Sequence, residues 1–142
     1  MRLSPAAELA NRGVTILSEE YGSGPVTLDA ICAARDLPKQ YLVKIFASLA
    51  RAELVTPIRG KKGGYMLSRP PTDITLLDVV EAVEGPIFLN LCQHSPPKCD
   101  QVHVCQIKKV WDSLQEAVRD RLGAMRLSDC VNGKAGGDNR PN

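Results

Sequence analysis

Residues 26–68 of the chain read VTLDAICAARDLPKQYLVKIFASLARAELVTPIRGKKGGYMLS, which predicts a capped helix, a short turn, a basic helix and a hairpin. Thr27 is suited to cap the first helix, and Val26 and Ile31 stand at the two positions of a hydrophobic staple. Pro38 fits the first position of the second helix, where its missing N–H costs nothing. Apolar residues recur along that helix at helical spacing and mark its core-facing side: Leu42, Ile45, Phe46 and Leu49.

Two short strands follow, at residues 54–58 and 65–67, and the loop between them is rich in glycine and basic residues. From Lys39 to Lys62 the chain carries six basic residues and one acidic residue, Glu53, whereas the whole chain has a net charge of only +2. The positive charge is therefore concentrated on the basic helix and the hairpin. This order of elements predicts a winged helix-turn-helix that binds duplex DNA, because phosphate contacts dominate such binding.

The second helix of a helix-turn-helix enters the major groove, where lysine contacts guanine and glutamine pairs with adenine. A tyrosine hydroxyl donates to phosphate, and a basic hairpin tip suits backbone charge or a narrow minor groove. The alternative is a solvated basic surface with a hairpin that only covers the core. The candidate DNA-contacting residues are Thr27, Pro38, Lys39, Gln40, Tyr41, Lys44, Arg59, Gly60, Lys61, Lys62 and Gly63.

Helices are also predicted on both sides of this segment. Residues 3–20 carry an imperfect apolar stripe, and Thr75 opens a capping box with Asp78. Five apolar steps from Ile107 to Met125 average 3.6 positions, which predicts one long amphipathic helix. So long a helix finds little of its own chain to pack on, so we expect a homodimer. The alternative is that this helix packs back onto the same chain.

Three of the five cysteines, Cys92, Cys99 and Cys105, are spaced C-x6-C-x5-C in one predicted loop. Thiolates are the usual ligands of iron–sulfur clusters, and three on one loop can surround a single centre. Zinc sites more often show C-x-x-C pairs, which the sequence lacks. The residues by themselves leave open an iron–sulfur cluster, a thiol switch through a disulfide, a zinc site and three unrelated cysteines.

Other features of the sequence exclude several classes of protein. The sequence has no run of 18 apolar residues, so we expect no membrane-spanning helix. Glu8, Asn11 and Arg12 interrupt the apolar stretch that a signal peptide would need. We therefore expect a cytoplasmic protein. Phosphate-binding loops, Gly-x-Ser-x-Gly and His-Glu-x-x-His are absent, so we expect no enzyme. A small redox or electron-transfer protein is the alternative from another class, and it rests on the cysteines alone.

Three motifs together resemble a known family. They are Leu37-Pro38-x-x-Tyr41-Leu42 with Ile45-Phe46-x-x-Leu49 and Leu54-Val55, then Arg59-Gly60-x-x-Gly63-Gly64-Tyr65-x-Leu67, then Thr75-Leu76-x-Asp78-Val79-x-x-Ala82-Val83-Glu84-Gly85. These look like the recognition helix, the wing and the following helix of the Rrf-type bacterial regulators, the IscR, NsrR and RirA group. The resemblance covers about residues 1–127.

The resemblance implies a dimeric winged-helix transcription factor whose long C-terminal helices cross. It also implies a 4Fe–4S or 2Fe–2S cluster at Cys92, Cys99 and Cys105 that senses iron, nitric oxide or redox state. Glu8 stands where some relatives supply a fourth ligand, from either subunit. Lys108 replaces the histidine ligand of other relatives.

We therefore expect a mainly α fold with a small β wing, built around a winged helix-turn-helix. The expected parts are a DNA-binding domain at 1–90, a cysteine-rich cluster-binding loop at 91–106, a dimerisation helix at 107–128 and a disordered tail at 129–142. The expected function is a transcriptional repressor at a pseudo-palindromic operator in double-stranded DNA. The alternative is a cluster-free regulator controlled by a thiol switch or a partner protein.

Overall fold

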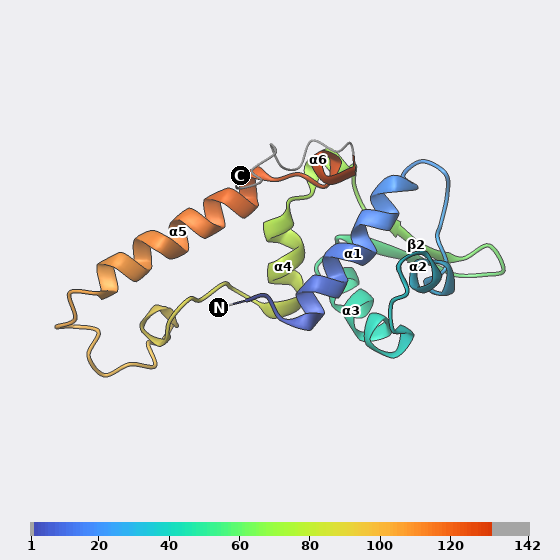
Figure 1. Ribbon diagram of the computed structural model, residues 1–142. Coiled ribbons are helices and arrows are strands. Elements are labelled where there is room, and N and C mark those ends of the chain that lie inside the picture. Colours follow the sequence, from blue (N-terminus) through green and yellow to red (C-terminus); the bar gives the residue numbers. More distant parts are fainter. Residues whose placement is uncertain (1, 132–142) are drawn as a thin grey trace, which may run out of the picture.

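The computed structural model describes residues 2–131 and is mainly helical, with one two-stranded antiparallel sheet (Figure 1). This confirms the predicted fold class. The elements in chain order are α1 (Pro5–Glu19), α2 (Leu28–Arg35), α3 (Lys39–Arg51), β1 (Val55–Ile58), β2 (Gly64–Leu67), η1 (Pro71–Asp73), α4 (Leu76–Glu84), η2 (Leu91–Gln93), α5 (Lys108–Ala124) and α6 (Leu127–Val131). None of the helices within residues 2–131 has both the length and the apolar character needed to cross a bilayer.

Side-chain caps set the helix boundaries close to where the sequence places them. The Thr27 hydroxyl accepts a hydrogen bond from the Ala30 amide at 3.1 Å and so caps α2. Asp36, in the left-handed conformation with φ 50°, ends α2. Thr75 and Asp78 form the predicted capping box of α4. Pro38 lies one position before the first turn of α3, in extended backbone, and not inside the helix as predicted.

The core lies where α1 and α3 pack together and is centred on Phe46, whose side chain is fully buried. Gly13 of α1 faces this ring, and a Cβ built there would lie 2.8 Å from Phe46 Cε2. The absence of a side chain at Gly13 therefore allows α1 to approach α3 closely. On its other side Phe46 meets the ring of Tyr65 edge to face, with centroids 4.8 Å apart.

The hairpin formed by β1 and β2 is here called the wing. It is hydrogen-bonded to Val26, which lies in extended backbone shortly before α2. Val26 donates to the Tyr65 carbonyl at 3.0 Å, and Tyr65 donates back to the Val26 carbonyl at 2.8 Å. Gly64 makes this approach possible, because a Cβ there would lie 2.3 Å from the Val26 carbonyl oxygen and its φ is 145°. Sequence analysis missed this pairing, which holds the wing beside the N-terminus of α2.

The C-terminal region differs from the predicted single helix to about residue 127. Helix α5 ends at Ala124, because the backbone then becomes extended and pairs with the start of α4 and the residues before it. Leu76 donates to the Met125 carbonyl at 2.9 Å, and Leu127 donates to the Ile74 carbonyl at 3.0 Å. Leu127 is thereby buried completely in the core and starts α6. Residues 129–131, assigned to a disordered tail, belong to α6, and the rest of that predicted tail lies outside the described residues.

Candidate DNA interface and cysteine loop

The outer face of α3 presents the residues that sequence analysis assigned to base and phosphate contacts. Lys39, Gln40 and Lys44 are exposed, and the Tyr41 side chain is 56% accessible. The opposite face is anchored in the core, since Leu42 is fully buried. This division follows from the helical period, and it holds a polar and basic surface on a rigid element.

Lys39 is paired within the protein, which sequence analysis did not foresee. Its ammonium lies 2.6 Å from a carboxylate oxygen of Asp29, which belongs to the first turn of α2. The hydrogen bond from Lys39 to Asp29 raises the pKa of Lys39 above its ordinary value. Because both side chains are well exposed, solvent screens the pair and it is open to exchange.

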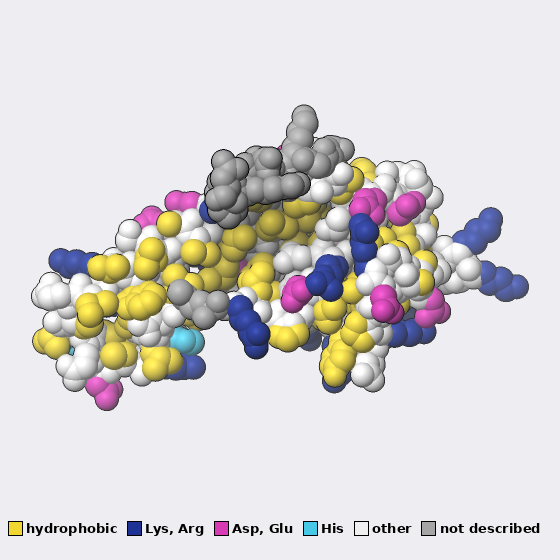
Figure 2. Space-filling view, in the orientation of Figure 1, with side chains coloured by type: hydrophobic (Ala, Val, Ile, Leu, Met, Phe, Trp, Pro, Cys, Tyr) yellow, Lys and Arg dark blue, Asp and Glu magenta, His cyan; other side chains and the backbone are white. Residues whose placement is uncertain are grey.

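The tip of the wing carries free positive charge. Arg59, Lys61 and Lys62 are exposed, and none of them takes part in the ion pairs found within residues 2–131. Figure 2 shows Lys and Arg side chains projecting from the end of the hairpin, beyond the rest of the surface. Gly60, with φ 109°, and Gly63, whose amide donates to the Gly60 carbonyl at 3.0 Å, form the turn that displays them.

The three cysteines of residues 91–106, here called the cysteine loop, differ in environment. Cys92 lies in η2 and is buried, Cys99 is half-buried and Cys105 is exposed, and all three are free thiols. Within residues 2–131, no group of three or more His, Cys, Asp or Glu side chains is close enough to hold a metal ion. The donor types suit an iron–sulfur cluster, but their placement in this single chain does not fit one.

Glu8, the predicted fourth ligand, is likewise engaged elsewhere. It lies in the first turn of α1 and forms an ion pair with Arg12, one turn further along the same helix. Both side chains are more than half exposed, so this pair holds Glu8 only weakly. The structure therefore keeps the four predicted ligands apart instead of assembling them.

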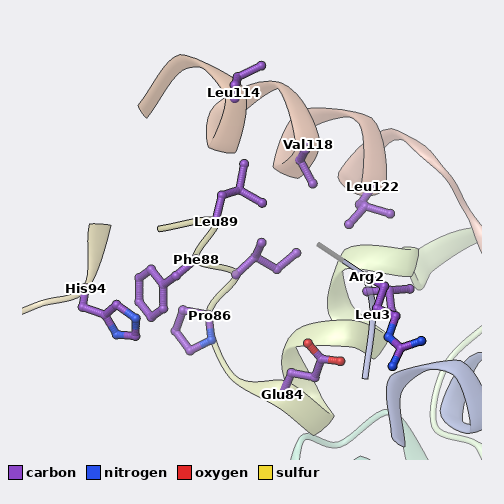
Figure 3. Close-up of a pocket in the computed structure, with 11 residues that line it drawn as sticks. Arg2, Leu3, Glu84, Pro86, Phe88, Leu89, His94, Leu114, Val118 and Leu122 are labelled. Atoms are coloured by element: carbon purple, nitrogen blue, oxygen red, sulfur yellow. The ribbon is translucent and has the colours of Figure 1, made fainter. Parts of the chain in front are cut away.

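Helix α5 extends away from the body of the molecule, and all of its residues keep part of their surface accessible (Figure 1). A groove of about 570 Å³ runs between α5 and residues 86–94. Figure 3 shows Val118 and Leu122 of α5 on one side of this groove, with Leu89 and Phe88 on the other. Four apolar side chains on this side are more than a third exposed: Ile107, which precedes α5, and Val110, Leu114 and Val118 within it.

A capped helix, a turn and an exposed basic helix, with a basic wing beside them, define the class of winged helix-turn-helix transcriptional regulators. The family model Rrf2, described as an iron-dependent transcriptional regulator, matches residues 3–133. The chain belongs to this family, which confirms the resemblance that its motifs indicated. The named relatives are transcriptional regulators and not enzymes.

Individual relatives agree with this assignment over most of their length. CymR of Bacillus subtilis strain 168 is 32% identical over 120 residues, which is 82% of this chain and 82% of that protein. The solved structure of CymR, called the global cysteine regulator of B. subtilis, has a TM-score of 0.73 at 27% identity and covers 94% of this chain and 98% of its own. The solved structure of T. potens IscR has a TM-score of 0.77 at 25% identity, and the match covers 100% of this chain and 93% of the IscR chain.

Proposed function

We propose that this regulator binds a pseudo-palindromic operator in duplex DNA as a cytoplasmic homodimer and acts as a repressor. The observation that carries the proposal is that the projecting tip of the wing and the outer face of α3 both expose basic side chains. Lys39, Gln40 and Lys44 would face base edges and phosphates, with Tyr41 donating to the backbone. Arg59, Lys61 and Lys62 would neutralise phosphates on either side of the adjoining groove.

The homodimer is supported by the exposed apolar side of α5. In a single chain, Ile107 and three apolar residues of α5 remain accessible to water: Val110, Leu114 and Val118. Covering this surface with a second copy would remove it from water, which is energetically favourable. A symmetric dimer would also present two copies of α3 to the DNA, one for each half of a pseudo-palindromic operator. Both features favour a second copy of this chain as the cover of α5.

Leu114→Lys is expected to give a monomer, because the new ammonium would be buried between two α5 helices. Affinity for a 30-base-pair duplex, selected by the wild type from a random-sequence pool, should fall about 100-fold or more through loss of the second contact. Light scattering and titration of the duplex measure the two effects. Ser113→Lys adds the same charge at an exposed position outside the apolar stripe and should remain dimeric. A Leu114→Lys variant that stays dimeric would contradict the proposed interface.

We further propose that the cysteine loop reads the signal through an iron–sulfur cluster. The family description as iron-dependent and three free thiols within 14 residues support this proposal. Because these thiols stand apart in the single chain, the proposal requires the loop to rearrange, or a second subunit to contribute a ligand. Control by thiol oxidation without a metal is the second candidate, favoured by the accessible, unbonded state of Cys99 and Cys105.

The protein isolated without air is expected to contain iron and sulfide and to absorb between about 320 and 460 nm. Replacing Cys92, Cys99 and Cys105 together with alanine should remove the iron and sulfide together with this absorbance. It should also change the affinity for the selected duplex by about 5- to 150-fold. Cys130→Ala, outside the loop, should behave like the wild type. A colourless wild type whose affinity still responds to oxidation would favour the thiol candidate. Equal affinities of the wild type and the triple variant would remove sensing by this loop.

A further inference from the structure

The side chain of Gln93 joins the cysteine loop to α5. It is the last residue of η2 and directly follows Cys92. Its Oε1 accepts hydrogen bonds from the amides of Leu89 at 2.9 Å and Asn90 at 3.0 Å. Its Nε2 donates to the main-chain carbonyl of Trp111, inside α5, at 2.6 Å. One amide group thus holds the start of the loop at one end and the long helix at the other.

This connection has no equivalent among the described residues, because no other side chain of residues 86–106 hydrogen-bonds to α5. Both ends of the Gln93 amide are occupied, so its orientation is determined by the network and not by chance. The neighbouring His94 stacks on Phe88, with ring centroids 4.3 Å apart, in the groove beneath α5. Gln93 is therefore bonded to α5, and its two neighbours are held by the burial of Cys92 and by the stacking of His94 on Phe88.

We propose that Gln93 is the positioning residue that transmits a change at the cysteine loop to α5. The inference rests on the proposed function, since it explains how a signal at Cys92 would reach the dimer and the reading helices. Cys92 is buried, so a group attached to its sulfur must displace its surroundings, and the adjoining residue moves with it. The Trp111 carbonyl then either follows Gln93 or loses its hydrogen bond. In the first case α5 moves with the loop, and in the second α5 is released from it.

Gln93→Glu separates the two ends of this connection. Its carboxylate keeps the size of the amide and still accepts from the Leu89 and Asn90 amides, so η2 is retained. It has no proton to donate and places a negative oxygen against the Trp111 carbonyl, so the contact with α5 is lost. Gln101→Glu makes the same charge change at an exposed position of the same loop and is the matched control. Gln93→Met, neutral and of similar length, replaces the glutamate variant if thermal melting shows that the latter is destabilised.

The experiment compares each protein before and after alkylation of the loop thiols with iodoacetamide, in a background with Cys32→Ala and Cys130→Ala. Because Cys92 is buried, alkylation is continued until peptide mapping by mass spectrometry shows that Cys92 itself is modified in every protein. Trp111 is the single tryptophan, so its fluorescence reports directly on α5 at the point of contact. In the parent and in Gln101→Glu, alkylation should shift this emission and change affinity for the selected duplex about 5- to 150-fold. In Gln93→Glu, alkylation confirmed by mass should leave the emission unshifted and the affinity for the duplex within about twofold of its earlier value, because the coupling between the two sites is lost.

The outcomes distinguish the inference from the proposed function. A Gln93→Glu protein that responds like the parent would overturn the role of Gln93 and leave loop control in place. A parent whose affinity is unchanged by alkylation of the loop would overturn loop control, and the role of Gln93 with it. Loss of response in Gln101→Glu as well would assign the effect to added charge and also overturn the role of Gln93.

Discussion

Replacing Arg59, Lys61 and Lys62 together with alanine is expected to lower the affinity for duplex DNA by on the order of 10³-fold or more at about 0.1 M salt. Each phosphate contact contributes about 0.9 to the slope of log affinity against log salt, so the six contacts of the proposed dimer, three from each wing, contribute about 5.4. These three residues are the exposed basic groups of the wing tip and have no ion-pair partner within residues 2–131. Titration of the selected duplex at several salt concentrations measures both the affinity and the slope.

The matched control replaces Lys98, Lys109 and Arg126 with alanine. These residues are also exposed, and they lie outside α2, α3 and the wing. The control lowers the net charge by the same amount, so any general electrostatic attraction falls equally in the two proteins. If the control loses as much affinity as the wing variant, or if the wing variant keeps the salt slope of the wild type, the wing does not contact phosphate.

Phe46→Ala is expected to lower the free energy of unfolding by about 3 to 5 kcal/mol, which is the usual cost of truncating a buried phenylalanine. The ring is fully buried between α1 and the wing, where it meets Gly13 and the edge of Tyr65. Relaxation of α1 into the vacated space is restricted, because α1 also packs on α4. Urea unfolding followed by circular dichroism measures the change, with the midpoint moving and the slope unchanged.

The only other phenylalanine of the chain provides the control. Phe88 is 36% exposed and stacks on His94 at the groove beneath α5, so Phe88→Ala should cost about 1 kcal/mol or less. A loss at Phe46 no greater than the loss at Phe88 would contradict the central packing of α1 on α3. Because Phe46 anchors α3 from inside, the stability lost there should also reduce the fraction of protein able to bind DNA.

Local rules of the chain predicted the helices and the exposed side of α3. The caps at Thr27 and Thr75 depend on side chains within three residues, and the buried position of Leu42 follows from helical spacing. The end of α5 was missed, since Met125 leaves the helix to pair with Leu76, about fifty positions earlier in the chain. No periodicity within the helix contains that information.

The candidate site divides in the same way. Residue type and order predicted the basic wing, the basic helix α3 and the cysteine loop, because charge and thiol chemistry belong to the side chains themselves. The ion pair of Lys39 with Asp29, the separation of the three cysteines and the bridge from Gln93 to Trp111 were decided only by the tertiary structure. The residues concerned are no more than 18 positions apart, but each feature depends on the path that the chain takes between them. That path is set by the turn between α2 and α3 and by the loop between α4 and α5, not by the spacing of residues in the sequence.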